Sequence, residues 1–285
     1  MMLTLTRPRA VARVHPLPRC GRGVSYAFVC VLAAAGAGAA ELRSVEVEGT
    51  AFKVTLADGR VLRSPELVGA VLTIAREGKP ARLRIDGVER DRAARRGDIW
   101  LHDLSLQAAD GSWQKLCQPG PDGRRQGFPL AGRTRSPAGH LEPAEPGVFE
   151  LTCTSGAEGK CVRFGYLPWN SAQELALYNA CLHLVRADYC GDGTPHTGDG
   201  VPIDLYDRLG IRKRALGATT LQFEAAWGPR GAICVRRVRL HELYSLDRLR
   251  VECPRLGAED IGEGCTEARK SQHPAALLIN RSPLR

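Results

Sequence analysis

Cysteines constrain the fold of this chain more than any other residue type. The sequence has ten, of which Cys20 and Cys30 lie in the first 40 residues and eight lie beyond them. The eight are Cys117, Cys153, Cys161, Cys181, Cys190, Cys234, Cys253 and Cys265. An even number of cysteines in an exported chain is typical of a disulfide framework. We therefore predict four bridges, provided that the chain is exported.

The first 40 residues have the pattern of a secretory signal peptide. They contain five arginines and no acidic residue, and residues 24–35 form an apolar run. Ala37-Gly38-Ala39 then resembles a cleavage site. The apolar run is shorter than the roughly 20 residues of a transmembrane helix. We predict that residues 1–40 are a signal peptide and that the mature chain has no transmembrane segment. An uncleaved N-terminal anchor is the alternative.

The amount and distribution of charge argue against nucleic acid as a partner. The formal net charge is +9, from 40 basic and 31 acidic residues. Without the five leader arginines, 35 basic residues face 31 acidic ones, which leaves a net charge of +4. The remaining basic residues are scattered and do not form a nucleic-acid motif. A solvated surface explains them, so we expect neither nucleic acid nor an anionic membrane as partner.

The spacing of the cysteines allows two local bridges. Cys153 and Cys161 flank a turn-rich segment, and Cys253 and Cys265 bracket a glycine-containing loop. A bridge across either loop requires facing Cβ atoms, and the other pairings stay open among the 105 that eight cysteines allow. The spacings of 7, 8 and 11 intervening residues do not fit the short Cys–Cys spacing of a structural zinc site.

The N-terminal part of the mature chain, residues 41–117, has the pattern of β-structure. Apolar and polar residues alternate, and three Asp-Gly pairs mark hairpin turns. Residues 100–106 and 112–117 form the last predicted hairpin. Residues 118–147 are rich in Pro, Gly and Arg without periodicity, which predicts a linker or long loop. We expect a β-rich sheet or sandwich-like part that ends before this segment.

Residues 148–285 mix both kinds of secondary structure. Strands are predicted at 148–152 and 162–166, followed by a helix that starts with the capping box Ser171 to Glu174 and stops at Gly191. A second hairpin is predicted at residues 222–227 and 232–235. The aromatic residues expected in the core are Tyr166, Trp169, Phe223 and Trp227. The predicted fold class is α+β, with a disulfide-stabilised domain of hairpins and helices over residues 148–285.

A series of motifs between residues 148 and 265 adds a family resemblance. Its centre is Ala187-Asp188-Tyr189-Cys190, and Lys160 to Tyr166, Ile203-Asp204 and Phe223 to Pro229 belong to the same series. These motifs resemble the ADYC-domain family of exported bacterial proteins, with Phe164 where that pattern leads us to expect tryptophan. The resemblance implies an envelope or extracellular protein, and it implies neither a cofactor nor catalytic residues.

The loop after the signature carries the side chains that could support catalysis. Asp188, His196 and Asp204 are candidate acid–base residues, and Asp192 could join them. Cys190 could act as a thiol nucleophile with His196 as its base, but a disulfide would consume that thiol. Turn formation by the aspartates is the structural alternative. An enzyme should gather His196 and two aspartates around an open cleft, whereas a binding module should bury the signature.

Calcium is the one metal that this loop could bind. Asp188, Asp192, Asp199 and Asp204 offer the hard oxygen ligands that calcium prefers, although their spacing does not fit a helix–loop–helix calcium site. We predict no metal and no cofactor, and keep calcium as the alternative.

These observations lead to one functional expectation and one alternative. We expect an exported, disulfide-stabilised, non-enzymatic binding or structural module of the bacterial envelope or extracellular space, with an envelope or extracellular partner. The alternative is a hydrolase that acts on an envelope polymer or peptide through residues 188–204.

Overall fold

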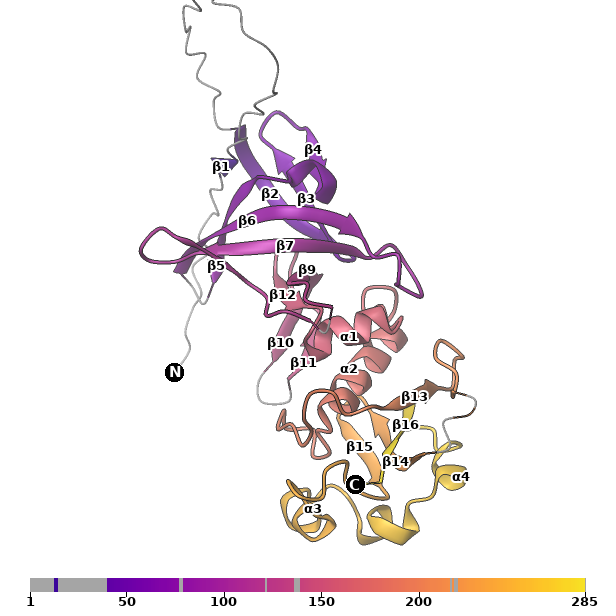
Figure 1. The fold of residues 1–285 in the computed structure, drawn as a ribbon. Coiled ribbons are helices and arrows are strands. Elements are labelled where there is room, and N and C mark those ends of the chain that lie inside the picture. The colour runs from indigo at the N-terminus through magenta and orange to yellow at the C-terminus, as the bar shows by residue number, and fades with distance from the viewer. Residues whose placement is uncertain are drawn as a thin grey trace, which may run out of the picture.

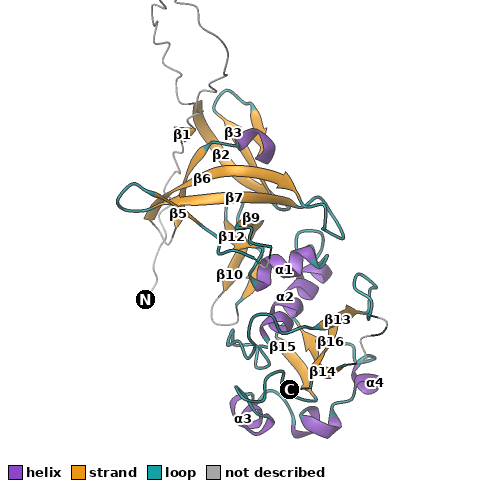
Figure 2. Cartoon of the chain, in the orientation of Figure 1, coloured by secondary structure: helices purple, strands orange, loops and turns teal. Residues whose placement is uncertain are grey.

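The computed structural model describes residues 13–14, 40–76, 79–120, 122–135, 139–215, 217 and 220–284. In Figure 1 the molecule is elongated, with the N-terminal strands at one end, the C-terminal sheet at the other, and helices α1 and α2 between them. Figure 2 shows the same division into a β-rich end and a mixed end. Of the predicted signal peptide, the structure describes only strand β1, Arg13–Val14, which pairs with β2, and Ala40, the first residue of β2.

Two antiparallel sheets build the N-terminal part. The first has the order β1-β2-β3-β4, and the second has the order β12-β9-β7-β6-β5 with β8 added beside β7. The strands of the first sheet after β1 are β2 Ala40–Glu48, β3 Ala51–Leu56 and β4 Val61–Arg63. The strands of the second are β5 Val71–Arg76, β6 Lys79–Arg90, β7 Trp100–Gln107, β8 Trp113–Lys115, β9 Gln126–Ala131 and β12 Phe149–Cys153. The predicted hairpin of residues 100–106 and 112–117 is the β7–β8 pair.

The prediction of a linker at residues 118–147 was wrong. This segment contains β9 and the two-stranded pair of β10, Arg133–Arg135, and β11, His140–Glu142. Strand β9 is central because it pairs with both β12 and β7. Its Phe128 and Leu130 are buried. Pro and Gly hid the strand in the sequence, but partners on both sides and burial of both strand faces outweigh their weak β-propensity.

The rest of the chain forms helices around a third main sheet. Its order is β13-β16-β14-β15. The helices are α1 Ala157–Arg163, α2 Ala172–Arg186, α3 Leu246–Glu252 and α4 Glu267–Lys270. The strands are β13 Asp204–Asp207, β14 Leu221–Gly228, β15 Gly231–Val235 and β16 Leu278–Pro283. Three 3-10 turns complete the order: η1 Ser64–Leu67, η2 Ala258–Asp260 and η3 Gly262–Gly264.

Two predictions for this part differ in outcome. Strands β14 and β15 form the expected second hairpin. The expected strand at 162–166 was wrong, because Val162 lies in α1 and is buried there beside Cys161. Cys161 of α1 is joined to Cys181 of α2 by a disulfide, so this segment packs against α2 instead of forming a hairpin strand.

Two apolar cores hold the molecule together. One fills the space between the N-terminal sheets and includes Phe52, Leu72 and Ile85. The larger core surrounds α2 and also takes in Ile99 and Phe128 from the N-terminal part. A smaller cluster lies around the bridge between Cys234 and Cys265. Because the larger core draws on both parts, the β-rich sheets and the helical part pack directly on each other.

The fold class is α+β, as predicted: antiparallel sheets, a few helices and four disulfides. None of the helices in the described part of the chain has the length and apolar character needed to cross a bilayer.

Candidate functional site

Helix α2 leads into the signature, and side chains fix both of its ends. The hydroxyl of Ser171 accepts a hydrogen bond from the backbone N–H of Glu174 at 3.1 Å, so half of the predicted capping box is present. The carboxylate of Glu174 binds Arg96 instead of returning to Ser171. The helix ends at Arg186 rather than at Gly191, because Ala187 adopts a left-handed conformation with φ of 52°.

Asp188 organises the turn that follows. Its carboxylate is fully buried and accepts backbone hydrogen bonds from Gly191, Asp192 and Gly193 at 2.8–3.1 Å. It also lies 2.7 Å from Nδ1 of His183. Burial alone would raise the pKa of Asp188, but the bonds from His183 and the loop amides hold it below its usual range. The signature aspartate therefore folds the loop back onto the end of α2.

Tyr189 connects this turn to the C-terminal sheet. Its hydroxyl donates to Glu224 at 3.1 Å and accepts from the backbone N–H of Arg239 at 2.8 Å. Glu224 and Arg239 form a fully buried ion pair with two bonds of 3.0 Å. The guanidinium of Arg239 also donates to two carbonyls in the last turn of α2, and Asn280 donates to Glu224. Helix α2, β14 and β16 are thus joined by one buried polar network.

Cys190 completes the signature by forming a disulfide with Cys253. Beside this bridge, Arg255 donates to the carbonyls of Tyr189, Cys190 and Ala232 at 2.5–2.8 Å. The position of Gly191 requires glycine, because its φ is +75° and an added Cβ would lie 2.0 Å from the carbonyl oxygen of Arg230. Because its sulfur is consumed in the bridge, Cys190 has no thiol to act as a nucleophile.

The two predicted local bridges were wrong. Cys153 pairs with Cys117, and Cys161 pairs with Cys181. Cys253 pairs with Cys190, and Cys265 pairs with Cys234. Because residues 162–166 are not a strand, no hairpin places Cys153 opposite Cys161. Instead, all four bridges join elements that lie 20 to 63 residues apart in the sequence.

The remaining loop candidates differ in exposure and in their contacts. His196 is half-buried and stacks on Tyr244 with ring centroids 3.8 Å apart, and burial lowers its pKa. Asp192 is exposed and accepts from the backbone N–H of Thr194. Asp199 is exposed, whereas Asp204 is buried on β13 and accepts from the backbone of Ala215. Among the residues that the structure describes, no group of three or more His, Cys, Asp or Glu could hold a metal ion.

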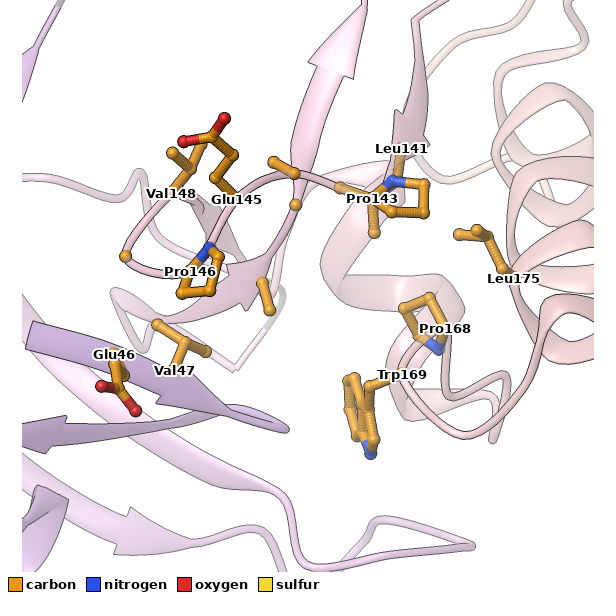
Figure 3. Close-up of a pocket in the computed structure, with 14 residues that line it drawn as sticks. Glu46, Val47, Leu141, Pro143, Glu145, Pro146, Val148, Pro168, Trp169 and Leu175 are labelled. Carbon is orange, nitrogen blue, oxygen red and sulfur yellow. The ribbon is translucent and has the colours of Figure 1, made fainter.

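A cavity lies elsewhere, where the N-terminal sheet meets the helical part. Its volume is about 440 Å³. Figure 3 shows Val47 and Pro146 on one side and Pro168, Trp169 and Leu175 on the other. The other lining residues are Glu46, Ala131, Gly132, Leu141, Pro143, Ala144, Glu145, Gly147 and Val148. The walls are largely apolar, and none of the signature residues lines them.

A comparison with models of protein families shows which family this chain is related to. The model of the ADYC domain matches residues 64–241, which is more than half of the 285 residues. The chain belongs to the ADYC-domain family. No curated protein and no solved structure matches it.

The ADYC match begins earlier than the motifs that first pointed to the family. It starts at Ser64, inside the β-rich part, and includes the signature, Glu224 and Arg239. It ends before Cys253 and Arg255. These two residues nevertheless contact the signature turn, Cys253 through its disulfide to Cys190 and Arg255 through a hydrogen bond to the carbonyl of Cys190. All four signature residues of the ADYC domain have structural partners: a helix end, three loop amides, a buried network and a disulfide.

Two of the four aromatic residues of the ADYC domain that were expected in the core are only partly buried, Phe223 and Trp169. Tyr166 and Trp227 are fully buried, as expected for core residues. Trp169 is half-buried and faces the cavity, so it belongs to the core only in part. The sequence held one signal for this partial exposure. Trp169 lies in the short connection Pro168-Trp169-Asn170 directly before Ser171, the first capping residue of α2.

Proposed function

We propose that this protein is an exported, non-enzymatic binding module of the bacterial envelope or extracellular space, and that it binds an extended peptide segment in the cavity around Trp169. The observation that carries the proposal is the cavity itself. It brings an accessible tryptophan and several prolines together at the junction of the two halves. Pockets of this size, with mostly apolar walls at a junction between parts of a protein, are typical ligand sites.

The peptide assignment follows from the chemistry of the walls. Pro143, Pro146 and Pro168 are rigid and have no backbone N–H, so they add apolar surface without competing donors. Together with Trp169 they can bind an apolar side chain of an extended segment, as aromatic-lined grooves do in peptide recognition. The carboxylate of Glu46 stands at the edge and can accept N–H donors, although it also lies 3.5 Å from Lys53.

Burial of the signature supports a binding role over the hydrolase alternative. Asp188 is fully buried and already accepts three backbone hydrogen bonds. Tyr189 is also fully buried, and its hydroxyl both donates and accepts. These side chains have structural partners, and so do the other two candidates: His196 stacks on Tyr244, and Asp204 accepts from the backbone of Ala215. The expectation stated for a binding module, a buried signature with recognition elsewhere, fits this arrangement.

Export is supported by the disulfides and by the leader pattern. Four bridges are consistent with folding in an oxidising compartment. The basic and apolar N-terminal residues have the features of a signal peptide. Mass spectrometry of the protein after secretion tests this part, because cleavage predicts a mature N-terminus near residue 40.

A positional-scanning hexapeptide library tests the cavity. Peptides that bind the oxidised, full-length protein should lose about tenfold or more in affinity for Trp169→Ala, a loss of at least about 1.4 kcal/mol. Phe223→Ala is the matched control, because it removes a half-buried aromatic side chain that does not line the cavity. Peptides that bind the Trp169→Ala variant as tightly as the natural protein would overturn the assignment of the cavity.

A further inference from the structure

The outer face of the second N-terminal sheet carries a group of cationic side chains around one tryptophan. On β6, Leu83 and Ile85 are fully buried, so the alternate residues Arg82 and Arg84 point outward. Figure 1 shows β6 and β7 crossing this end of the molecule with no element in front of them. The sheet therefore presents these arginines on an open face.

Strand register brings the members of this group together. Arg84 pairs with Ser105 on β7, and Ser105 pairs with Lys115 on β8. In the neighbouring row, Trp113 pairs with Gln107, whose side chain accepts from Arg82 at 3.0 Å. Strands lie about 4.8 Å apart and alternate residues about 6.6 Å apart, so the three cations form a cluster about 10 Å wide.

The indole of Trp113 orders the two arginines. The guanidinium of Arg84 lies 4.5 Å from the ring centroid, and that of Arg82 lies 5.8 Å from it. Stacking on an aromatic face leaves the edges of a guanidinium free to donate. Arg84 donates to Asp86 through Nε. Its two terminal nitrogens have no hydrogen-bond partner among the described residues, so they can donate to a ligand.

One carboxylate lies inside the group without cancelling its charge. Asp86 accepts from Arg84, Ser105 and Lys115, with Lys115 Nζ at 2.8 Å. Three cations against this one carboxylate leave a local charge of +2. The next acidic group on this face, Asp103, pairs with Gly87 in the middle of the β6–β7 pair, one alternate position along β7 from Ser105, and it borders the group on that side.

We propose that Arg82, Arg84, Trp113 and Lys115 form a binding platform for an anionic polysaccharide. The platform is an open sheet face, so it can hold an extended chain rather than enclose a small anion. The cations attract carboxylate or sulfate groups, and the indole offers an apolar surface to a sugar ring. The exposed large apolar side chains, Val61, Val68, Leu209, Leu243, Val251 and Leu284, all lie outside these strands. An interfacial membrane-binding surface also buries apolar side chains in the lipid headgroup region, and among the described residues on this face only Trp113 could serve in that way.

Immobilised alginate, a polymer of uronic acids, tests the platform with the oxidised full-length protein. Arg82→Gln with Arg84→Gln should weaken binding about tenfold at low salt and reduce its salt dependence. Arg248→Gln with Arg250→Gln is the matched control, because it removes two exposed arginines of α3 and the same charge. Equal loss in both double variants would show a net-charge effect and overturn the platform.

Further measurements test the role of the indole and compare polysaccharide with other possible ligands. Trp113→Ala keeps the platform's cations and should also weaken alginate binding, and unchanged binding would contradict the role of the indole. Neutral dextran should not bind. Anionic phospholipid vesicles and single-stranded DNA serve as competitors, and tighter binding to either would overturn the assignment to polysaccharide. The unfolding midpoint of each variant establishes that a loss of binding is not a loss of folding.

Discussion

At the scale of single residues, buried polar side chains carry much of the specificity of this fold. His102 on β7 is fully buried, and its Nε2 lies 2.8 Å from the hydroxyl of Ser64. That hydroxyl also accepts the backbone N–H of Phe52. The arrangement ties the 3-10 turn η1 to both N-terminal sheets. A serine–histidine pair is thus used for structure, because neither residue is accessible to a substrate.

Burial makes His102 a source of acid sensitivity. It lowers the pKa of this side chain from 6.5 to about 4, because the charged form is poorly solvated. The unfolded chain takes up a proton below about pH 6.5 while the folded chain does not, so stability is complete above that pH and falls toward pH 4. The slope is about 1.4 kcal/mol per pH unit.

Urea unfolding with intact disulfides at pH 7 and pH 5 measures this effect. The free energy of unfolding should fall by about 2 kcal/mol less between pH 7 and pH 5 in His102→Gln than in the natural protein. Glutamine cannot take up a proton and can still bond to Ser64. An unchanged pH dependence in this variant would show that other groups cause the acid sensitivity.

At the scale of elements, the end of α2 is joined to the C-terminal sheet by one ion pair. Arg239 satisfies carbonyls of the last helical turn and neutralises Glu224 on β14. A cation at this position also interacts favourably with the helix dipole. The signature turn lies directly between these partners, so its Tyr189 hydroxyl bonds to both residues.

A double-mutant cycle tests how strongly these elements depend on each other. Arg239→Met should destabilise the protein by about 3–5 kcal/mol, because Glu224 is left as a buried, unpaired charge. Adding Glu224→Gln removes that charge, so the double variant should recover part of the loss. Chemical unfolding of the two single variants and the double variant gives the coupling. Additive losses would mean that the pair is not coupled in the folded state.

At the scale of the whole molecule, the disulfides connect segments that the sequence separates. Cys117–Cys153 closes the N-terminal sheet, Cys161–Cys181 joins α1 to α2, and two bridges secure the C-terminal segment. Each contributes about 2–4 kcal/mol by restricting the unfolded chain. The bridge from Cys253 to Cys190 also fixes a segment beyond the family match to the signature turn.

Mass spectrometry under denaturing conditions tests this framework. The exported protein should show no free thiol among its last eight cysteines, and non-reducing peptide mapping should recover the four bridges of the structure. A peptide linked through Cys153 and Cys161 would contradict the structure and restore the local pairing predicted from sequence. A free Cys190 thiol would reopen the question of cysteine chemistry at the signature.

The sequence by itself determined the features that depend on local pattern and on residue type. The even set of cysteines indicated a disulfide framework, the Asp-Gly turns marked β-structure, and Ser171 marked the start of α2. The signature residues also sufficed to indicate the ADYC family. These features depend on short-range backbone preferences and side-chain chemistry, which a single sequence displays directly.

Only the tertiary structure decided which residues meet. It made β9 a central strand despite Pro129, because β7 and β12 lie on either side of it. It chose the bridges, since pairing depends on the distance between Cβ atoms rather than on sequence spacing. It also buried Asp188 among loop amides and left Trp169 at a cavity. Burial and contact are properties of the packed chain, and they separated structural residues from candidate recognition residues.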